Sequence, residues 1–326
     1  MDPNKIRYSR FAVNDRPFCV WEWDLKERTT EFLQTADPGY FEYVAQLHIA
    51  NIVGENARRA AVALRTNYAH GLESFFALLF ACFQAPDCVP GWLAKYQLTD
   101  LRALVAKVTS CRPFRSKIKL QFNSWEELAA IVHEIAMEEE GERALWRKEL
   151  GRLWAGFARD FLDEEQSVEY NSLKHGFRVS PGGFILSVGF EPTPGVSPPP
   201  EAMMSIGGSQ FGSSFFKAEE LSQKGRHFRI RRQSRNWIPE NHYHGLLFLS
   251  NSMDNVLSFL KRARGAEPSS APMRRPESQE SYRYPWRLKT GPVGFNVDTV
   301  VARENIKEFT AEEILAIYDS LPTAEE

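Results

Sequence analysis

One polar segment, Glu169-Tyr-Asn-Ser-Leu-Lys-His-Gly-Phe-Arg178, carries residue types that could act on a phosphodiester. Residues four apart share one face of a helix, so Asn171 and His175 are expected to lie together with Lys174 beside them. A histidine can take or give a proton near neutral pH, while an amide or a cation can hold a phosphate oxygen. Cleavage of RNA without a metal ion requires such a base and such a positive group.

The segment Arg65-Thr-Asn-Tyr-Ala-His-Gly-Leu-Glu73 has a similar composition. Asn67, His70 and Glu73 are three residues apart and share a helix face. We therefore take Arg65, Asn67, His70 and Glu73 as secondary site candidates. The apolar neighbours of His70 favour another interpretation, a buried histidine that is hydrogen-bonded within the core.

The region from about residue 40 to residue 180 resembles the HEPN superfamily of helical bundles. The motif of that family is an arginine, four to six residues that often begin with a polar one, and a histidine on a late helix. His175 matches the histidine and Asn171 matches the polar residue, whereas Tyr170 occupies the arginine position. The run Tyr68–Phe80 is similar to the alanine- and glutamate-containing pattern of the family's second helix.

The resemblance implies an RNA-binding protein, and specifically a metal-independent endoribonuclease of a defence or stress system. It also implies a homodimer, because HEPN proteins usually pair two bundles to build one site. His175 would then act as the base and Asn171 would orient the phosphate. Lys174 or Arg178 would supply the positive charge in place of the missing arginine.

Other interpretations remain open. Tyr170 at the arginine position favours a catalytically inactive interaction or scaffold protein that uses the same helical body. His175 also precedes Gly176 at an expected helix end, where a cation suits the negative end of the helix dipole and glycine suits the C′ position. The spacing from Arg65 to His70 satisfies the family motif as well, but on an earlier helix than the family uses.

A basic segment, Arg226-His-Phe-Arg-Ile-Arg-Arg-Gln-Ser-Arg-Asn-Trp237, is typical of a strand. Phe228 and Ile230 are expected to face the core while the arginines between them face water. Basic side chains beside an aromatic ring suit an RNA backbone and a stacked base, and a solvated edge strand is the alternative. A second basic cluster, at residues 112–119, would extend this patch or lie on a loop. The candidate RNA-binding residues are Arg226, Arg229, Arg231, Arg232, Arg235 and Trp237.

No metal and no small-molecule cofactor are expected. His242 and His244 would project to one side of a strand, but with only Glu240 nearby they do not favour a metal site. The glycine-rich run 207–212 precedes a strand-like sequence, so it gives no support for a Rossmann or P-loop phosphate site. The four cysteines lack metal-ligand spacing and are expected to be free thiols in a reducing compartment. They are Cys19, Cys82, Cys88 and Cys111.

The bulk composition is that of a globular protein. The chain has 326 residues, 43% hydrophobic and 25% charged, which allows one large domain or two ordinary ones. A net charge of -2 does not by itself indicate nucleic acid or a membrane. The most apolar window, Phe75–Phe83, is too short to cross a bilayer, so we expect a soluble cytoplasmic protein without a membrane partner.

The order of elements predicts an α+β fold. Residues 1–37 are expected to form an N-terminal hairpin-like pair of strands, and residues 38–178 a HEPN-like helical bundle. Residues 179–326 would form a β-rich region with two further helices. The stretch 267–280, rich in proline, serine, glutamate and arginine, is predicted to be a mobile loop.

Several individual elements are predicted within this order. A strand is expected at Phe18–Leu25, and His70–Cys82 is apolar on nearly all sides, as at the centre of a bundle. A single long helix is expected from Glu142 to Ser172. The segment Leu246–Leu260 has one apolar helical face, and a capping box begins a closing helix at Thr310.

Overall fold

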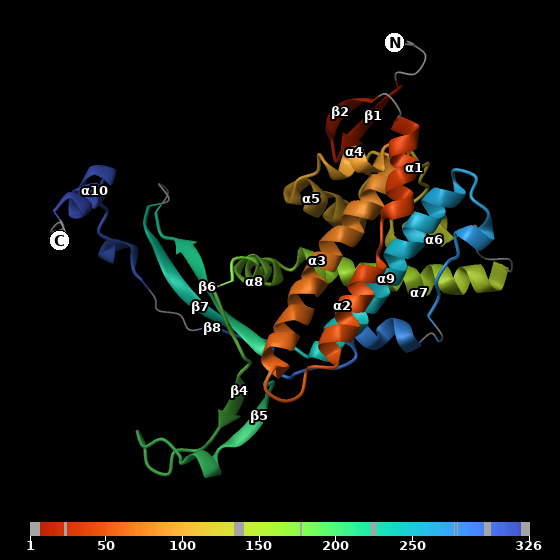
Figure 1. The fold of residues 1–326 in the computed structure, drawn as a ribbon. Helices are drawn as coiled ribbons and strands as arrows, with labels where there is room; N and C mark the ends of the chain where they lie inside the picture. Colours follow the sequence, from red (N-terminus) through yellow and green to blue (C-terminus); the bar gives the residue numbers. More distant parts are fainter. Residues whose placement is uncertain are drawn as a thin grey trace, which may run out of the picture.

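The computed structural model describes residues 7–22, 25–133, 140–176, 178–222, 226–276, 278, 280–296 and 301–320. The fold is mixed α+β, as predicted, with an N-terminal hairpin, a helical body and a sheet-rich half that carries two further helices (Figure 1). Its α-helices are α1 (Leu25–Thr35), α2 (Gly39–Ile49), α3 (Ala57–Gln84), α4 (Val89–Leu93), α5 (Leu98–Thr109), α6 (Trp125–His133), α7 (Glu140–Leu162), α8 (Glu164–Lys174), α9 (Pro239–Arg262) and α10 (Ala311–Asp319). Its strands are β1 (Arg7–Val13), β2 (Arg16–Glu22), β3 (Val179–Pro181), β4 (Ile185–Val188), β5 (Met204–Gly208), β6 (Gly212–Glu220), β7 (Phe228–Asn236) and β8 (Gly294–Asn296). Its 3₁₀ turns are η3 (Pro200–Ala202), η4 (Pro268–Ser270), η5 (Glu280–Trp286) and η6 (Arg303–Asn305).

The N-terminal strands β1 and β2 form an antiparallel hairpin. Asn14 in the two-residue turn has a φ of 53°, a left-handed conformation that asparagine tolerates and that tight hairpin turns require. The strand predicted from Phe18 to Leu25 is shorter than expected. It ends at Glu22, and Leu25 is already the first residue of α1.

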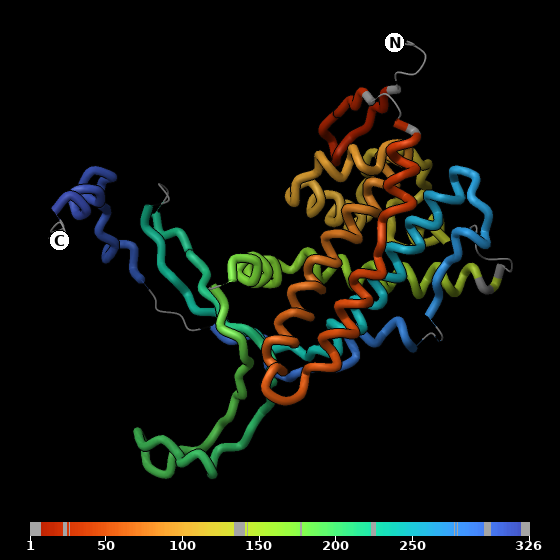
Figure 2. Tube along the Cα trace, in the orientation of Figure 1, coloured from red at the N-terminus to blue at the C-terminus, as the bar shows by residue number. Residues whose placement is uncertain are grey.

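The centre of the helical body is the second half of α3. Every residue from Phe75 to Phe83 is buried, which confirms the prediction from its all-round apolar sequence. Helices α2 and α9 pack along α3, and the views in Figures 1 and 2 show the three running side by side. Helix α3 therefore gives the other elements a rigid axis.

The predicted single helix from Glu142 to Ser172 is two helices, α7 and α8. The break lies at Asp163, whose φ and ψ are extended and whose carboxylate accepts a hydrogen bond from the Gln166 backbone N–H at 3.0 Å. This is N-capping, and it satisfies a donor that a new helix start would leave unpaired. The break lets α8 leave the axis of α7 and lie against the sheet.

The hydrophobic core continues beyond residue 178. The apolar face of α9, which includes Leu246, Leu249 and Val256, belongs to the same buried cluster as α3. Helix α9 begins at Pro239, so the predicted strand around His242 and His244 is wrong and both histidines lie on a helix. A chain segment of sixty-odd residues thus leaves the body after α8, forms three of the four strands of the sheet, and returns as α9.

The stretch predicted to be a mobile loop is held against α9 over its described residues. Ser258 donates a hydrogen bond to the Pro272 carbonyl at 2.7 Å, and Asn255 accepts one from the Arg274 N–H at 2.6 Å. Ala271 is buried. Proline- and serine-rich composition did not predict these anchors because they are supplied by polar side chains on a distant helix.

The sheet has the strand order β3-β6-β7-β8, with antiparallel pairing throughout. Strands β4 and β5 form a separate two-stranded arm that extends from its base, and α10 lies beyond the far end of the β6–β7 hairpin (Figures 1 and 2). Helix α10 begins with the predicted capping box between Thr310 and Glu313. Within the described ranges, no helix has both the length and the apolar character needed to cross a membrane.

Candidate functional site

The structure brings the two polar segments together on neighbouring helices. Arg65 on α3 and Glu169 on α8, 104 residues apart in the chain, form an ion pair with 2.6 Å between Nη2 and Oε2. Two turns further along α3, the Glu73 carboxylate lies 3.9 Å from the Lys174 ammonium. The first contact is buried and the second faces outward, so α3 and α8 are joined at two levels.

Lys174 is exposed, as are three polar side chains close to the pair along the two helices: His70 on α3, and Asn171 and His175 on α8. With Glu73 they form what we call the α3–α8 patch. The Lys174 ammonium also lies 4.6 Å from the centre of the Tyr170 ring, a cation–π distance. The residue at the arginine position of the motif thus contacts a cation without supplying one.

His70 is exposed, so the prediction of a buried core histidine is wrong. Its ring meets the edge of Phe41 from α2, with 5.5 Å between ring centres. Partial burial lowers the pKa of His70, while the Glu73 carboxylate raises it and the Lys174 ammonium lowers it. His70 is therefore within electrostatic reach of both charged members of the patch. Asn67, by contrast, donates to the Ala63 carbonyl within α3 at 2.8 Å.

His175 ends α8, as the capping interpretation predicts. Gly176 has a φ of 66°, and its N–H donates to the Leu173 carbonyl at 3.1 Å. These are backbone interactions, so they leave the exposed imidazole of His175 open to a ligand. Arg178 follows at the start of the sheet and is also exposed.

Arg65 cannot play the part of the motif arginine, although its spacing to His70 fits. Its guanidinium is buried and donates to Glu169 through Nε and Nη2, and Nη1 lies 3.2 Å from Nε2 of His242. Glu169 is fully buried and accepts further hydrogen bonds from Ser213 and from Trp237 Nε1. Burial alone would raise the pKa of Glu169, but Arg65 and Ser213 hold it below its usual value. We call these five residues the buried knot.

The basic strand β7 has the opposite orientation to the one predicted. Phe228 and Ile230 are 53% and 65% exposed, whereas Gln233 and Arg235 are buried. Helix α8 covers the inner face of the sheet, where Ser213 of β6 donates a hydrogen bond to Glu169. Apart from the buried Phe215, the side chains that β6 and β7 present to this face are polar. The prediction that neighbouring residues of β7 face opposite sides was correct, but hydrophobicity did not indicate which side is buried.

Of the six predicted RNA-binding residues, some are paired with carboxylates, one lies in the buried knot, and two are exposed. Arg229 and Arg231 both pair with Glu219 across the inner face, with nitrogen–oxygen distances of 2.7 Å. Arg235 pairs with Asp163 and Glu165 at the start of α8. Trp237 lies in the buried knot, where its ring is inaccessible to a stacked base. Exposed positions in this set are held by Arg226 and Arg232.

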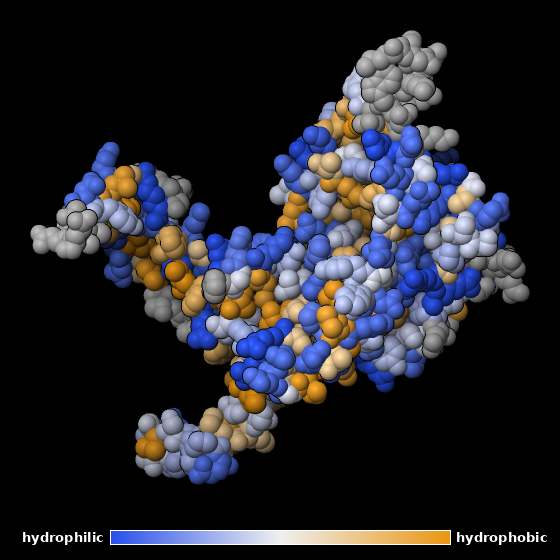
Figure 3. All heavy atoms as spheres, in the orientation of Figure 1, coloured by the Kyte–Doolittle hydropathy of each residue, from blue (hydrophilic) through white to orange (hydrophobic). Residues whose placement is uncertain are grey.

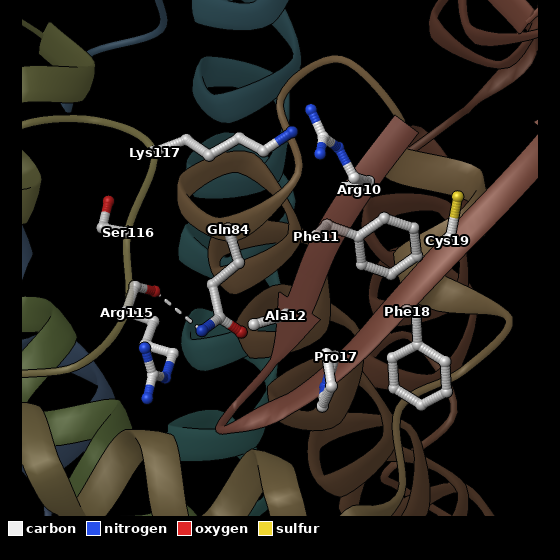
Figure 4. Close-up of a pocket in the computed structure, with 10 residues that line it drawn as sticks. All are labelled: Arg10, Phe11, Ala12, Pro17, Phe18, Cys19, Gln84, Arg115, Ser116 and Lys117. Carbon is white, nitrogen blue, oxygen red and sulfur yellow. Dashed lines mark hydrogen bonds between the residues drawn. The ribbon is translucent and has the colours of Figure 1, made fainter. Parts of the chain in front are cut away.

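Part of the second basic cluster lines a hollow of about 560 Å³ between the N-terminal hairpin and the loop at 112–122 (Figure 4). Two of its cations are already paired, Lys117 with Asp87 at 2.6 Å and Arg115 with Asp15 at 3.3 Å. The third, Arg10, lies over the ring of Tyr8, with 5.6 Å to the ring centre. Gln84 uses both amide atoms, donating to the carbonyls of Asn14 and Arg115 and accepting from the Asn14 N–H. We call this the N-terminal hollow, and its polar wall serves to join two parts of the fold.

No group of three or more histidine, cysteine, aspartate or glutamate side chains is placed to hold a metal ion among the described residues. His242 and His244 do not converge, because His242 contacts Arg65 while the ring of His244 stacks on Tyr284 with 5.1 Å between centres. The four cysteines are free.

Sequence reasoning missed Glu169 and His242 as interacting residues. Glu169 stood within a named segment, but nothing local identified a buried ion pair with a residue 104 positions earlier. Comparison with known proteins adds no further guide: no family model, no curated protein and no solved structure matches this chain.

Proposed function

We propose that this protein binds RNA and cleaves it without a metal ion at the α3–α8 patch. The observation that carries the proposal is the pairing of Glu73 with Lys174, which joins two polar motifs distant in sequence into one exposed surface. That surface holds two imidazoles, one cation and one amide. The resemblance to HEPN ribonucleases, drawn from His175 and Asn171, points to the same chemistry.

The residue roles follow from what RNA cleavage needs. One imidazole must take the proton of the 2′-hydroxyl while the other gives a proton to the departing 5′-oxygen. We assign the first role to His175, which has the freer ring, and the second to His70. Lys174 and the Asn171 amide would stabilise the charge that develops on the phosphate, and Glu73 would orient Lys174.

Activity on single-stranded RNA in EDTA tests this proposal most directly. His175→Ala and His70→Ala are each expected to lower the cleavage rate by about 10²- to 10⁴-fold, the usual contribution of a general acid or base. His48→Ala, at the last turn of α2, is the matched control and should retain full activity. Circular dichroism would check that helix α8 survives the change at its end.

Binding provides a second, separable measurement. If Lys174 and Arg178 contact phosphates, the double variant Lys174→Gln and Arg178→Gln should weaken RNA binding and flatten its dependence on salt, since each phosphate contact releases counterions. Binding without cleavage would reject the catalytic half of the proposal and keep the RNA-binding half. A wild-type protein that neither binds nor cleaves RNA would reject both.

A second candidate function is a non-catalytic scaffold that associates with another copy of itself. It is favoured by the outer face of the sheet, where Phe216, Phe228 and Ile230 are 60%, 53% and 65% exposed, and by α10, which has no buried residue. Figure 3 shows apolar side chains at the surface of the sheet and of α10. Light scattering on Phe228→Asp tests this together with the cleavage assay. A wild-type dimer that does not cleave RNA and becomes a monomer on this change supports the scaffold, and a wild-type monomer contradicts it.

A further inference from the structure

A second hollow, of about 420 Å³, lies where α3, α8 and α9 meet the segment 285–293. We call it the junction pocket. The start of α8 borders it through Asp163 and Gln166, whereas the α3–α8 patch lies at the other end of that helix. On α8, five residues separate Gln166 at the pocket from Asn171 of the patch, a rise of roughly 7.5 Å at 1.5 Å per residue.

Two buried polar atoms on neighbouring residues of α9 have no hydrogen-bond partner among the described residues. They are Nδ1 of His242 and Oδ1 of Asn241, and both residues line the pocket. His242 is 6% exposed. Because a guanidinium can only donate, Nε2 of His242 must accept from Arg65, so its Nδ1 carries the hydrogen. Asn241 uses its amino group on the Leu288 carbonyl at 2.9 Å, which leaves its oxygen as an acceptor.

The chemistry of this pair is fixed by its surroundings. Burial, together with the charge of Arg65, keeps the pKa of His242 well below its usual value, so the ring is neutral and offers one N–H. The pair therefore presents one donor and one acceptor to the pocket, each of which costs free energy while it is buried and unpaired. A ligand that carries a donor and an acceptor on adjacent atoms would satisfy both.

Aromatic rings form part of the pocket wall and are held in place. The Tyr68 hydroxyl and Trp286 Nε1 both donate to Oδ2 of Asp160, at 2.7 and 2.8 Å. Gly156 makes room for the tryptophan, since a Cβ there would lie 2.3 Å from its ring. A flat ring suits a slot between fixed aromatic side chains.

Cations flank the opening. Lys289 is exposed and lines the pocket. On the other side of Trp286 lies a hollow of about 650 Å³ with four arginines in its wall, and two of them, Arg283 and Arg287, come from the same segment as Trp286. Positive charge on both sides of an aromatic wall favours a ligand that is flat at one end and anionic at the other.

We propose that the junction pocket binds a nucleotide, with its base against His242 and Asn241 and its phosphate at Lys289. The edge of every nucleobase offers a donor beside an acceptor, the ring suits the aromatic wall, and the volume lies in the range of small-ligand sites. The inference goes beyond the RNA site proposed above, because the pocket would serve either a free nucleotide or a base flipped out of a bound strand.

The test is a calorimetric titration of the full chain with each of the four nucleoside monophosphates. We expect at least one to bind, and Asn241→Leu to weaken it by about tenfold or more because the buried base would lose a hydrogen bond. Lys289→Gln should weaken the nucleotide but not the nucleoside. Matched controls are Asn251→Leu, two turns or more along the same helix, and Lys261→Gln at its end.

Ribose 5-phosphate and a short single-stranded RNA complete the design. If ribose 5-phosphate binds as tightly as a nucleotide, or if Asn241→Leu and Asn251→Leu behave alike, base recognition is rejected. Absence of binding by all four nucleotides rejects the pocket for free ligands, and retention of RNA affinity by Asn241→Leu then rejects it for strand bases as well. If the RNA competes with the nucleotide for the pocket, the base that the pocket binds can come from an RNA strand. His175→Ala should leave nucleotide binding unchanged, which separates this inference from the ribonuclease proposal.

Discussion

The N-terminal hollow and the junction pocket are of comparable size but differ in their polar walls. In the first, Gln84 bonds through both atoms of its amide, and Lys117 and Arg115 are paired with carboxylates. In the second, His242 and Asn241 each retain one buried atom without a partner. A hollow whose polar atoms are satisfied joins parts of a fold, whereas one with unmatched atoms has chemistry left for a ligand. Polar satisfaction, rather than volume, distinguishes them.

The largest effect should come from the buried knot behind the junction pocket. Arg65→Ala would leave Glu169 buried without its ion-pair partner, and removing one member of such a pair costs about 3–5 kcal/mol. Urea denaturation measures this. Glu169→Gln, which keeps part of the hydrogen bonding, should cost less than removal of the arginine. If Arg65→Ala and Glu169→Gln lower the free energy of unfolding by equal, small amounts, water reaches the buried knot and the inner wall of the pocket is hydrated.

The next effect is a pH dependence from two buried histidines. Burial lowers the pKa of His133 to about 4, and both of its ring nitrogens are bonded, to Ala129 and Asn255. Between pH 6.5 and 4 the unfolded chain binds a proton that the native chain does not, so stability is complete above pH 6.5 and falls as the pH drops. The loss from His133 would be on the order of 3 kcal/mol across this window.

Denaturation at a series of pH values measures this slope. His242 should add to it, since its pKa is also lowered by burial. His133→Gln should flatten the slope in part, leaving the contribution of His242. If the nucleotide proposal holds, a saturating ligand should also stabilise the native state near neutral pH, where His242 is neutral and can pair. A slope unchanged by His133→Gln would contradict the assignment.

A smaller effect is expected at the N-terminal hollow. Gln84→Leu removes the partner of the Asn14 N–H and of two carbonyls, and leaving buried groups unsatisfied costs about 1–3 kcal/mol. Thermal and urea unfolding should both detect it, while nucleotide binding should not change. A loss of ligand affinity in this variant would break the comparison, because it would assign binding to the wrong hollow.

The smallest effect should be that of Asn241→Leu on stability. Its oxygen has no partner to lose, and its amino group bonds only at the exposed rim, so the change should stay within about 0.5 kcal/mol. The same variant is expected to weaken nucleotide binding strongly. Gln84→Leu should therefore lower stability but not nucleotide binding, whereas Asn241→Leu should lower nucleotide binding but hardly affect stability. This difference sharpens the distinction between the two hollows.

The sequence was sufficient to predict the hairpin, the buried centre of α3 and the capped start of α10, because each depends on residues close together in the chain. The start of α6 shows the same kind of local interaction, since Ser124 accepts a hydrogen bond from the Glu127 N–H at 3.2 Å. Short-range rules such as periodicity and capping act in the unfolded chain as in the folded one, so they can be read before the structure is known.

The remaining features depend on partners that local patterns do not reveal. The predicted orientation of β7 was wrong because this strand presents Gln233 and Arg235 to the buried face of the sheet, so its apolar side chains lie outside. The contact of Arg65 with Glu169 and His242 joins three distant segments through one polar cluster. The run Lys174-His175-Gly176 was enough to predict a helix end, but not that His70 on another helix lies within electrostatic reach of Lys174.

The return of α9 to the helical body has a consequence for synthesis on the ribosome. Helices α2 and α3 leave the tunnel long before α9, and until it arrives the surface that α9 covers in the native core is open to water. A nascent chain in this state is prone to association through that surface. A fragment ending near residue 178 would carry the same defect permanently, so truncations meant to isolate the bundle should be extended through Arg262 or include α9 in trans.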